Sequence, residues 1–239
     1  MTWSIIARDE NGNFGVAVAS RFFAVGALCV HTRRGVGALS TQALVNPLYG
    51  PTGLHLLASG QSPEQVVQQL THADAGQAQR QLHVLGLTGR GAAHTGATCV
   101  DWCGHRIEDD FSVAGNMLAN PQVIEATADA FMSAHGLPLA ERLLTAMAAG
   151  EAAGGDKRGK QAAALRIHGD EDYPDLDLRV DDHLDPITEL QRLYQVSLER
   201  FQPFVACLAG RHDAVGLTDR TLIEASIERF HAGRRARGL

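Results

Sequence analysis

Residues 2–21 read TWSIIARDENGNFGVAVASR and contain two short apolar runs on either side of an Asn-Gly pair. Trp3 and Ile5 alternate with the residues between them, which is the period-2 pattern of a β-strand. Asn11-Gly12 is typical of a tight turn, and the small-residue run FGVAVAS after it is typical of a returning strand. The stretch predicts a β-hairpin that begins at the second residue, so we expect the first strand to be buried in the fold.

The composition suits one large folded unit, because the chain has 239 residues, of which 45% are hydrophobic. A net charge of −6 gives no electrostatic reason to expect nucleic acid or an anionic membrane as a partner. No run approaches the roughly 20 apolar residues of a membrane span, and no signal peptide precedes the first strand, so we expect a cytoplasmic protein. The four cysteines show neither a disulfide framework nor a zinc-like spacing. We therefore expect reduced thiols, no bound metal and no cofactor.

Strand-like and helix-like segments follow each other in blocks. The strand-like segments are ALCVHTR, GVGALSTQA, the hairpin QRQLHVLGLTGRGAAHTG, DDFSVAGNML, KQAAALRIHG and DLDLRVDDH. Helix starts are predicted at Ser62-Pro63, Asn120-Pro121 and Pro138. Because alternating βαβ units are missing, a doubly wound parallel sheet is not expected. The order predicts an α+β fold, in which two packed antiparallel sheets carry helices on both outer faces.

The chain divides by pattern into two parts. We expect residues 1–184 to form the sandwich and residues 185–239 to form a C-terminal helical extension packed on the same domain. A long amphipathic helix opens the extension and carries Ile187, Leu190 and Phe201 on one face. This apolar stripe could form an interface, so we expect a homodimer or larger homo-oligomer.

Thr2 is a candidate nucleophile. After loss of Met1 it would carry a hydroxyl and a free α-amine on one residue, and the amine has an ordinary pKa of ~7.7–8.0. A neutral amine can take the hydroxyl proton, which is the Thr and N-terminus form of a nucleophile with its own base. The alternative is that Thr2 is only the first residue of a strand.

A family resemblance supports the catalytic interpretation. The blocks TWSIIARDENGNFGVAVASRFFAVGA, STQALVNPLYGPTGL, AAHTGATCVDWCGH, FSVAGNMLA, GEAAGGDKRGKQAAAL and YPDLDLRVDDHLDP together resemble an uncharacterised bacterial family, a domain of unknown function. That family is placed in the superfamily of N-terminal nucleophile (Ntn) hydrolases. The resemblance implies a four-layer αββα sandwich, and it implies that the opening residue performs any hydrolysis.

The chain departs from the pattern of proteasome-like members of the superfamily. Their second strand ends in an acidic residue before an Arg, whereas this one ends Ala19-Ser20-Arg21, and no Lys precedes Lys157. Arg21, Arg8, or Arg33 with Arg34 could supply positive charge that tunes the amine, and Arg21 could also bind substrate. An arginine cannot exchange protons near neutral pH, so it cannot act as a proton shuttle.

Asn116 is the leading candidate for stabilising an oxyanion. The strand FSVAGN ends at Gly115-Asn116, where a side-chain amide could donate to a tetrahedral intermediate. The alternative is an asparagine that only starts a turn.

The loop GEAAGGDKRGKQ concentrates polar residues. It fits the spacing of a phosphate loop, but Gln161 stands where Ser or Thr is needed, and the order helix, loop, strand is wrong for nucleotide binding. Asp156, Arg158, Lys160 and Gln161 could bind a substrate carboxylate, or the loop could be a solvated turn. Thr95, in AHTGATCVDWCGH, is expected in the wall of a substrate pocket.

Three functions remain open from the sequence. The first is an Ntn-type amidohydrolase that acts on a small acylated amino acid or short peptide, with Thr2 and Asn116 in catalysis. The second is a non-catalytic protein that binds a small polar metabolite on the same scaffold. The third is a subunit whose chief role is assembly.

Overall fold

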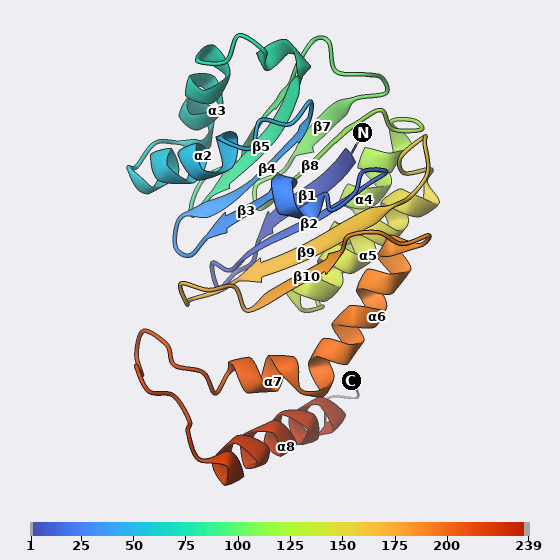
Figure 1. Ribbon diagram of the computed structural model, residues 1–239. Coiled ribbons are helices and arrows are strands. Elements are labelled where there is room, and N and C mark those ends of the chain that lie inside the picture. The colour runs from blue at the N-terminus through green and yellow to red at the C-terminus, as the bar shows by residue number, and fades with distance from the viewer. Residues whose placement is uncertain (1, 237–239) are drawn as a thin grey trace.

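The computed structural model describes residues 2–236 and shows two antiparallel sheets packed face to face (Figure 1). The strands are β1 (Thr2–Arg8), β2 (Phe14–Ser20), β3 (Val30–Arg33), β4 (Gly37–Ala43), β5 (Arg80–Gly86), β6 (Ala92–Thr95), β7 (Gly104–Ile107), β8 (Phe111–Asn116), β9 (Ala162–His168) and β10 (Leu176–Val180). The six-stranded sheet has the order β10-β9-β2-β1-β8-β7, and the four-stranded sheet has the order β3-β4-β5-β6. Met1 and residues 237–239 lie outside this description.

The opening stretch forms the predicted hairpin. β1 and β2 pair from Trp3 opposite Ala19 to the closing pair of Arg8 and Phe14. The Asp9 carboxylate holds the turn by accepting hydrogen bonds from neighbouring backbone N–H groups. β8 pairs with the other edge of β1, so the first strand lies inside the sheet and is buried on both faces, apart from its last residue. A strand with neighbours on both edges ties down the start of the chain.

Helices cover the outer face of each sheet and complete a four-layer αββα sandwich, which confirms the predicted fold class (Figure 1). The helices are α1 (Gly26–Cys29), α2 (Tyr49–Ala58), α3 (Pro63–His72), α4 (Gln122–Ser133), α5 (Leu139–Ala152), α6 (Pro186–Glu199), α7 (Phe201–Val205) and α8 (Arg220–Ala236), with a 3₁₀ turn at Gln77–Gln79. α4 and α5 pack on the six-stranded sheet, and α2 and α3 pack on the four-stranded sheet.

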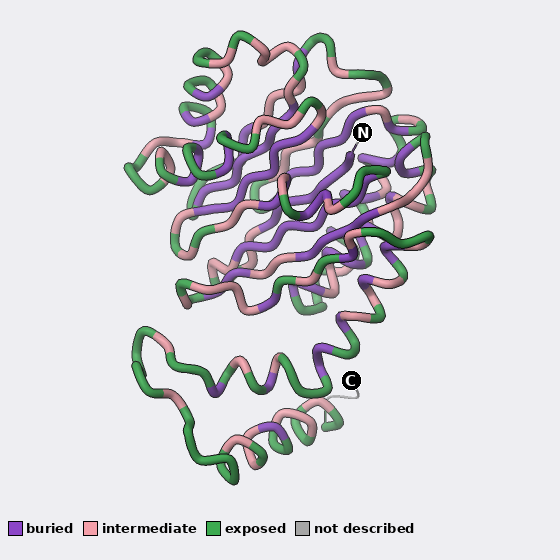
Figure 2. Tube along the Cα trace, in the orientation of Figure 1, coloured by how far each residue is buried: buried purple, intermediate pink, exposed green. Residues whose placement is uncertain are grey.

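The apolar core has three parts that match these layers. Figure 2 shows that buried residues are concentrated along the strands of both sheets. Trp3 and Phe131 belong to the part between the six-stranded sheet and its helices. Leu39 and Val66 belong to the part under α2 and α3. Val16 belongs to the part between the two sheets. Because β1 and β2 contribute to two of these parts, their residues are buried on both faces.

Gly150 sets how closely α5 approaches α4 above β1. A Cβ built on Gly150 would overlap Thr127 Oγ1 and lie 2.8 Å from Trp3 Nε1. We expect Gly150→Ala to lower the free energy of unfolding by about 1–3 kcal/mol through overpacking. Urea unfolding measures this, and Gly136→Ala is the matched control, because a Cβ there meets nothing within 4 Å. Equal stability of the two variants would contradict this packing.

The structure corrects two local predictions. The segment ALCVHTR is a strand only in its second half, since Gly26–Cys29 forms the short helix α1. The long C-terminal helix ends at Glu199, and Phe201 begins the separate helix α7. Pro203 explains the break, because it has no N–H to donate to residue 199 and its ring clashes with that carbonyl. The predicted hairpin from β5 to β6 and the capping box of Ser62 and Gln65 are confirmed.

The C-terminal helices differ in how far they join the sandwich. Leu190 and Tyr194 of α6 are buried in the same core part as Trp3. α7 and α8 extend beyond the edge of the six-stranded sheet, and they contact each other (Figure 1). Within residues 2–236, no helix is long and apolar enough to cross a membrane.

Candidate active site

Thr2 lies at the end of β1, between the ends of two neighbouring strands. Across the sheet it is directly opposite Asn116 of β8, and on the other side Trp3 pairs with Ala19, which places Ser20 beside Thr2. The Thr2 hydroxyl donates to Ser20 Oγ at 3.2 Å. Thr2 is only 5% exposed. Its side chain is on the face of β1 that looks toward the four-stranded sheet, since its neighbour Trp3 packs under α4 and α5.

Three side-chain amides from different strands meet behind Thr2. Gln42 of β4 and Asn116 of β8 both donate to the carbonyl oxygen of Thr2, each at 3.4 Å. The same two amides donate to Gln81 Oε1 of β5, at 2.8 and 3.0 Å. Gln81 in turn donates to Thr95 Oγ1 at 2.8 Å and to two backbone carbonyls. The amides therefore hold the backbone of Thr2 in place, Asn116 from the neighbouring strand of the same sheet and Gln42 from the opposite sheet.

A second branch of this polar layer runs through His83. Ser4 Oγ donates to Gln42 Oε1 at 2.7 Å and lies 2.8 Å from His83 Nε2. Because the Ser4 hydrogen is used on Gln42, Ser4 accepts from His83 Nε2–H. His83 Nδ1 then accepts from the Ser112 hydroxyl at 3.0 Å. All four side chains are at most 1% exposed, and hydrogen bonding is what makes their burial tolerable.

The buried His83 makes the free energy of unfolding depend on pH. Burial, followed by the charge of His105, lowers the pKa of His83 to about 3, whereas the unfolded chain has a histidine pKa near 6.5. Between about pH 3 and pH 6.5 the unfolded state therefore binds more protons than the folded state. The contribution of neutral His83 to the free energy of unfolding is complete above about pH 6.5 and is lost as the pH falls toward 3.

We expect His83→Gln to flatten this dependence. The slope of unfolding free energy against pH, measured in urea between pH 5 and 6.5, should fall by up to about 1.4 kcal/mol per pH unit. His72→Gln, at an exposed histidine of α3, is the control and should keep the slope of the unaltered protein. An unchanged slope in His83→Gln would show that His83 does not titrate as described.

The glycine-containing loop 154–160 bridges the ends of β2 and β8, the two strands that flank β1. The buried Asp156 carboxylate accepts from Arg21 N at 2.8 Å. The next residue, Lys157, donates its backbone N–H to Met117 O at 3.4 Å. Gly154 and Gly155 have positive φ, which a side chain would strain. The loop therefore passes over the end of the sheet where Thr2 lies.

The other loop residues that were expected to bind substrate fall into two groups with different partners. Arg158 pairs with Asp156 at 3.2 Å, and its carbonyl accepts from Arg21 Nη1. Lys160 pairs with Glu151 at 3.2 Å and also with Asp185, while Gln161 donates to Asp182. Asp156, Arg158 and Arg21 are thus brought together at the end of β2. Lys160 and Gln161 tie the loop to α5 and to the segment before α6.

Thr95 and its neighbours occupy the other side of the polar layer. Thr95 Oγ1 accepts from Gln81 and lies at hydrogen-bond distance from His105 Nδ1, 2.9 Å away, so the chain of amides ends at an exposed histidine. Cys99 and Cys103 are free thiols whose pKa values are raised, chiefly by burial. Within residues 2–236, no group of three or more His, Cys, Asp and Glu is arranged to hold a metal ion.

Sequence reasoning missed the residues that support Thr2 from the opposite sheet, namely Gln42, Gln81 and His83. Gln42 and Gln81 stood in predicted strands, where alternation could have flagged polar side chains on one face. No signal in one sequence shows that this face meets a second sheet. Lys157 was also passed over, although its ammonium group reaches Asp101 O at 2.5 Å beside the end of β8.

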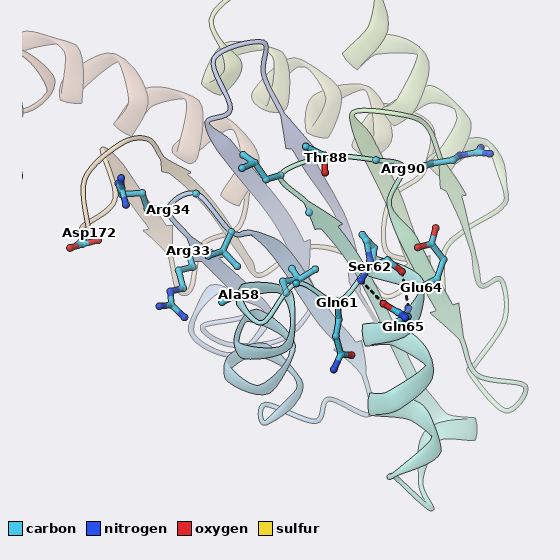
Figure 3. Close-up of a pocket in the computed structure, with 18 residues that line it drawn as sticks. Arg33, Arg34, Ala58, Gln61, Ser62, Glu64, Gln65, Thr88, Arg90 and Asp172 are labelled. Atoms are coloured by element: carbon cyan, nitrogen blue, oxygen red, sulfur yellow. Dashed lines mark hydrogen bonds between the residues drawn. The ribbon is translucent and has the colours of Figure 1, made fainter.

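A cavity of about 990 Å³ lies at the other end of the sandwich, where the β3–β4 and β5–β6 turns meet the start of α3 (Figure 3). Three arginines border it, but Arg34 bonds Asp170 and Arg90 bonds the Ile107 carbonyl. Ser62 and Gln65 use their side chains on each other in the capping box. The hydroxyl suited to attack on a carbonyl, together with the amides that hold its residue in place, is at the Thr2 end instead.

The layered fold and the buried polar layer beside the first strand define an αββα sandwich protein with a candidate site between its sheets. Residues 2–190 match the family model described as "Family of unknown function (DUF1028)", and the chain belongs to this family. The crystal structure of protein SPO2555 from Silicibacter pomeroyi, also assigned to DUF1028, is 32% identical, with a TM-score of 0.85. That similarity covers 92% of this chain and 96% of the other.

A more distant similarity is to Anbu (ancestral beta-subunit) from Yersinia bercovieri. The two chains are 12% identical, with a TM-score of 0.41, over 82% of this chain and 94% of that chain. No curated protein matches this chain.

Proposed function

We propose that the protein is an amidohydrolase in which Thr2, freed by removal of Met1, attacks the carbonyl carbon of a small acylated amino acid or short peptide. The α-amine of Thr2 takes the hydroxyl proton and later returns a proton to the departing amine. Water then hydrolyses the ester formed on Thr2. General-base assistance of this kind contributes roughly 10²–10⁴-fold to the rate.

The observation that carries the proposal is the way the polar layer holds Thr2. A residue that only began a strand would need no more than the backbone hydrogen bonds to its neighbouring strands. Here Gln42 and Asn116 reach its carbonyl from two different strands, and Ser20 accepts from its hydroxyl. Preorganised groups around a nucleophile are what fast covalent catalysis requires.

Asn116 acts in this proposal as a positioning residue. Its amide donates to Gln81 Oε1 and to Thr2 O, so both of its N–H groups have acceptors. Arg21 and Lys157 supply positive charge at the ends of β2 and β8, and nearby cations lower the pKa of an amine. Asp156 fixes the loop that carries Lys157 and Arg158, the cations suited to a substrate carboxylate.

The direct test is the intact mass of protein purified from its own host. A mass lower by one methionine is expected, because a free amine on Thr2 is required. Incubation with an epoxyketone, which needs both the hydroxyl and the amine of one residue to form its ring adduct, should then add one inhibitor mass. Retained Met1 together with no adduct would rule the proposal out.

A second candidate function is a non-catalytic binding protein on the same scaffold, and one observation favours it. Both Asn116 N–H groups are engaged, so this amide would have to move before it could donate to an oxyanion. Thermal-shift screening with acylated amino acids, paired with product detection, separates the two functions. Stabilisation without product supports binding alone.

A further inference from the structure

A cavity of about 600 Å³ lies at the Arg8 end of β1, far along the strand from Thr2. The β1–β2 turn, the β7–β8 turn and the start of α5 form its walls. Its lining includes Arg142 and the acidic residues Glu10 and Asp109. The proposed function uses none of these groups.

The Arg142 guanidinium has neither an ion-pair partner nor a hydrogen-bond acceptor among residues 2–236. Its guanidinium stacks on the Phe131 ring, with 4.0 Å between Cζ and the ring centroid. The Nε atom is buried and has no hydrogen-bond partner among residues 2–236. No carboxylate in that part of the chain lies within ion-pair distance of the guanidinium. Because the protein covers Nε, a ligand in the cavity would reach the two terminal nitrogens, which make no hydrogen bond to residues 2–236 and point to a carboxylate as their partner.

Negative charge faces Arg142 from the two turns without pairing with it. Asp9 is engaged by the backbone of its own turn, and Asp110 pairs with Arg8 at 2.6 Å. Glu10 and Asp109 are exposed, and across residues 2–236 their carboxylates pair with no cation. Burial lowers the pKa of Arg142, and the charges of Asp9, Asp110 and Glu10 oppose that change. The acidic side of the cavity is therefore close enough to act on the guanidinium.

This charge pattern selects one class of small molecule. An anion would be attracted by Arg142 but repelled by Glu10 and Asp109. A cation would be attracted by the two carboxylates but repelled by Arg142. A molecule that carries both charges satisfies both sides, with its carboxylate held by the planar fork of the guanidinium. Phe111, Phe131 and Leu137 line the same cavity and offer an apolar wall.

We propose that the cavity between the β1–β2 turn, the β7–β8 turn and α5 binds the zwitterion of an apolar α-amino acid. Arg142 holds the carboxylate, Glu10 and Asp109 hold the ammonium group, and the apolar side chain lies against Phe111 and Leu137. This site is separate from Thr2 and does not require Thr2 to be active.

Calorimetric titration of the full chain with L-leucine tests the proposal. Saturable binding is expected at millimolar leucine. 4-Methylpentanoate lacks the ammonium group and 3-methylbutylamine lacks the carboxylate, so each should bind at least about tenfold more weakly. Arg142→Gln should weaken leucine binding by at least about tenfold as well. Arg33→Gln, at a cation of the other cavity, and Thr2→Ala should bind leucine as the unaltered protein does.

The double variant Glu10→Gln, Asp109→Asn keeps the test decisive if Arg142→Gln fails to fold, because both of its sites are exposed turn residues. It should weaken leucine binding and leave 4-methylpentanoate binding unchanged or stronger. The proposal is overturned if leucine shows no saturable binding or if a folded Arg142→Gln binds leucine normally. It is equally overturned if 4-methylpentanoate binds as tightly as leucine, because the site would then be a simple anion site.

Discussion

Thr2→Ala should lose amide hydrolysis by at least about 10⁴-fold while keeping its fold, because the substitution removes the attacking oxygen. The variant keeps the α-amine and the strand register, and it loses only the hydrogen bond from Thr2 Oγ1 to Ser20. Loss of one such bond changes stability by about 1 kcal/mol. Product release from a panel of N-acylated amino acids and dipeptides measures the activity, and urea unfolding measures the stability.

Thr2→Ser is the matched control for this prediction. Serine keeps both the hydroxyl and the amine, so it should retain measurable turnover and should still form the epoxyketone adduct. Ser4→Ala, two residues along the same strand, removes another buried hydroxyl and should still form the adduct at Thr2. Full activity of Thr2→Ala would exclude the nucleophile, whatever the state of Met1.

Gln42→Ala should lower the free energy of unfolding by about 3 kcal/mol or more. Gln42 is 1% exposed, and its amide joins Ser4 and Gln81 to the carbonyls of Thr2 and Ala114. Alanine leaves a cavity and strips several buried groups of a partner, and each such group costs about 1–3 kcal/mol. Because Thr2 also loses a donor to its carbonyl, turnover should fall more than stability alone explains. Urea unfolding and turnover at a fixed folded fraction separate the two effects.

The control for this prediction is Gln68→Ala on the exposed face of α3, which should change stability by no more than about 0.5 kcal/mol. A cost for Gln42→Ala below 1 kcal/mol would mean that the polar layer is not a cooperative network. Gln81→Ala provides an independent check, because it interrupts the same layer between Asn116 and Thr95.

Much of the fold could be read from local patterns. The alternation around Ile5 and the turn at Asn11-Gly12 predict the first hairpin, and Ser62 with Gln65 predicts the start of α3. Such signals lie within a few neighbouring residues, so a single chain displays them. β7 had no comparable signal, because Gly104–Ile107 is short and has no clear alternation. The end of α6 was misjudged because the apolar periodicity continues to Phe201, although Pro203 interrupts the helix.

The candidate site could be predicted only at its centre. Thr2 is recognisable because its chemistry is carried by one residue and its position in the chain, and Asn116 is recognisable as the polar end of an apolar strand. Asp156, Arg158, Lys160 and Gln161 were identified as a group, but in the structure Asp156 and Arg158 contact Arg21, whereas Lys160 and Gln161 contact Glu151 and Asp182. The path of the loop across the sheet determines which of its cations lies at the end of β2 and which lies at the end of β8.

Local patterns in the sequence predicted the α+β class, the hairpin at the start of the chain, the starts of α3, α4 and α5 and the candidacy of Thr2. The packing of the two sheets is what brings Ser4, Gln42, Gln81 and His83 into one buried layer behind Thr2. Alternating polar residues in a strand normally indicate a solvent-facing side, and here that side faces a second sheet about 10 Å away. Facing strands that are distant in sequence satisfy these polar groups, so their role depends on contacts that no local pattern records.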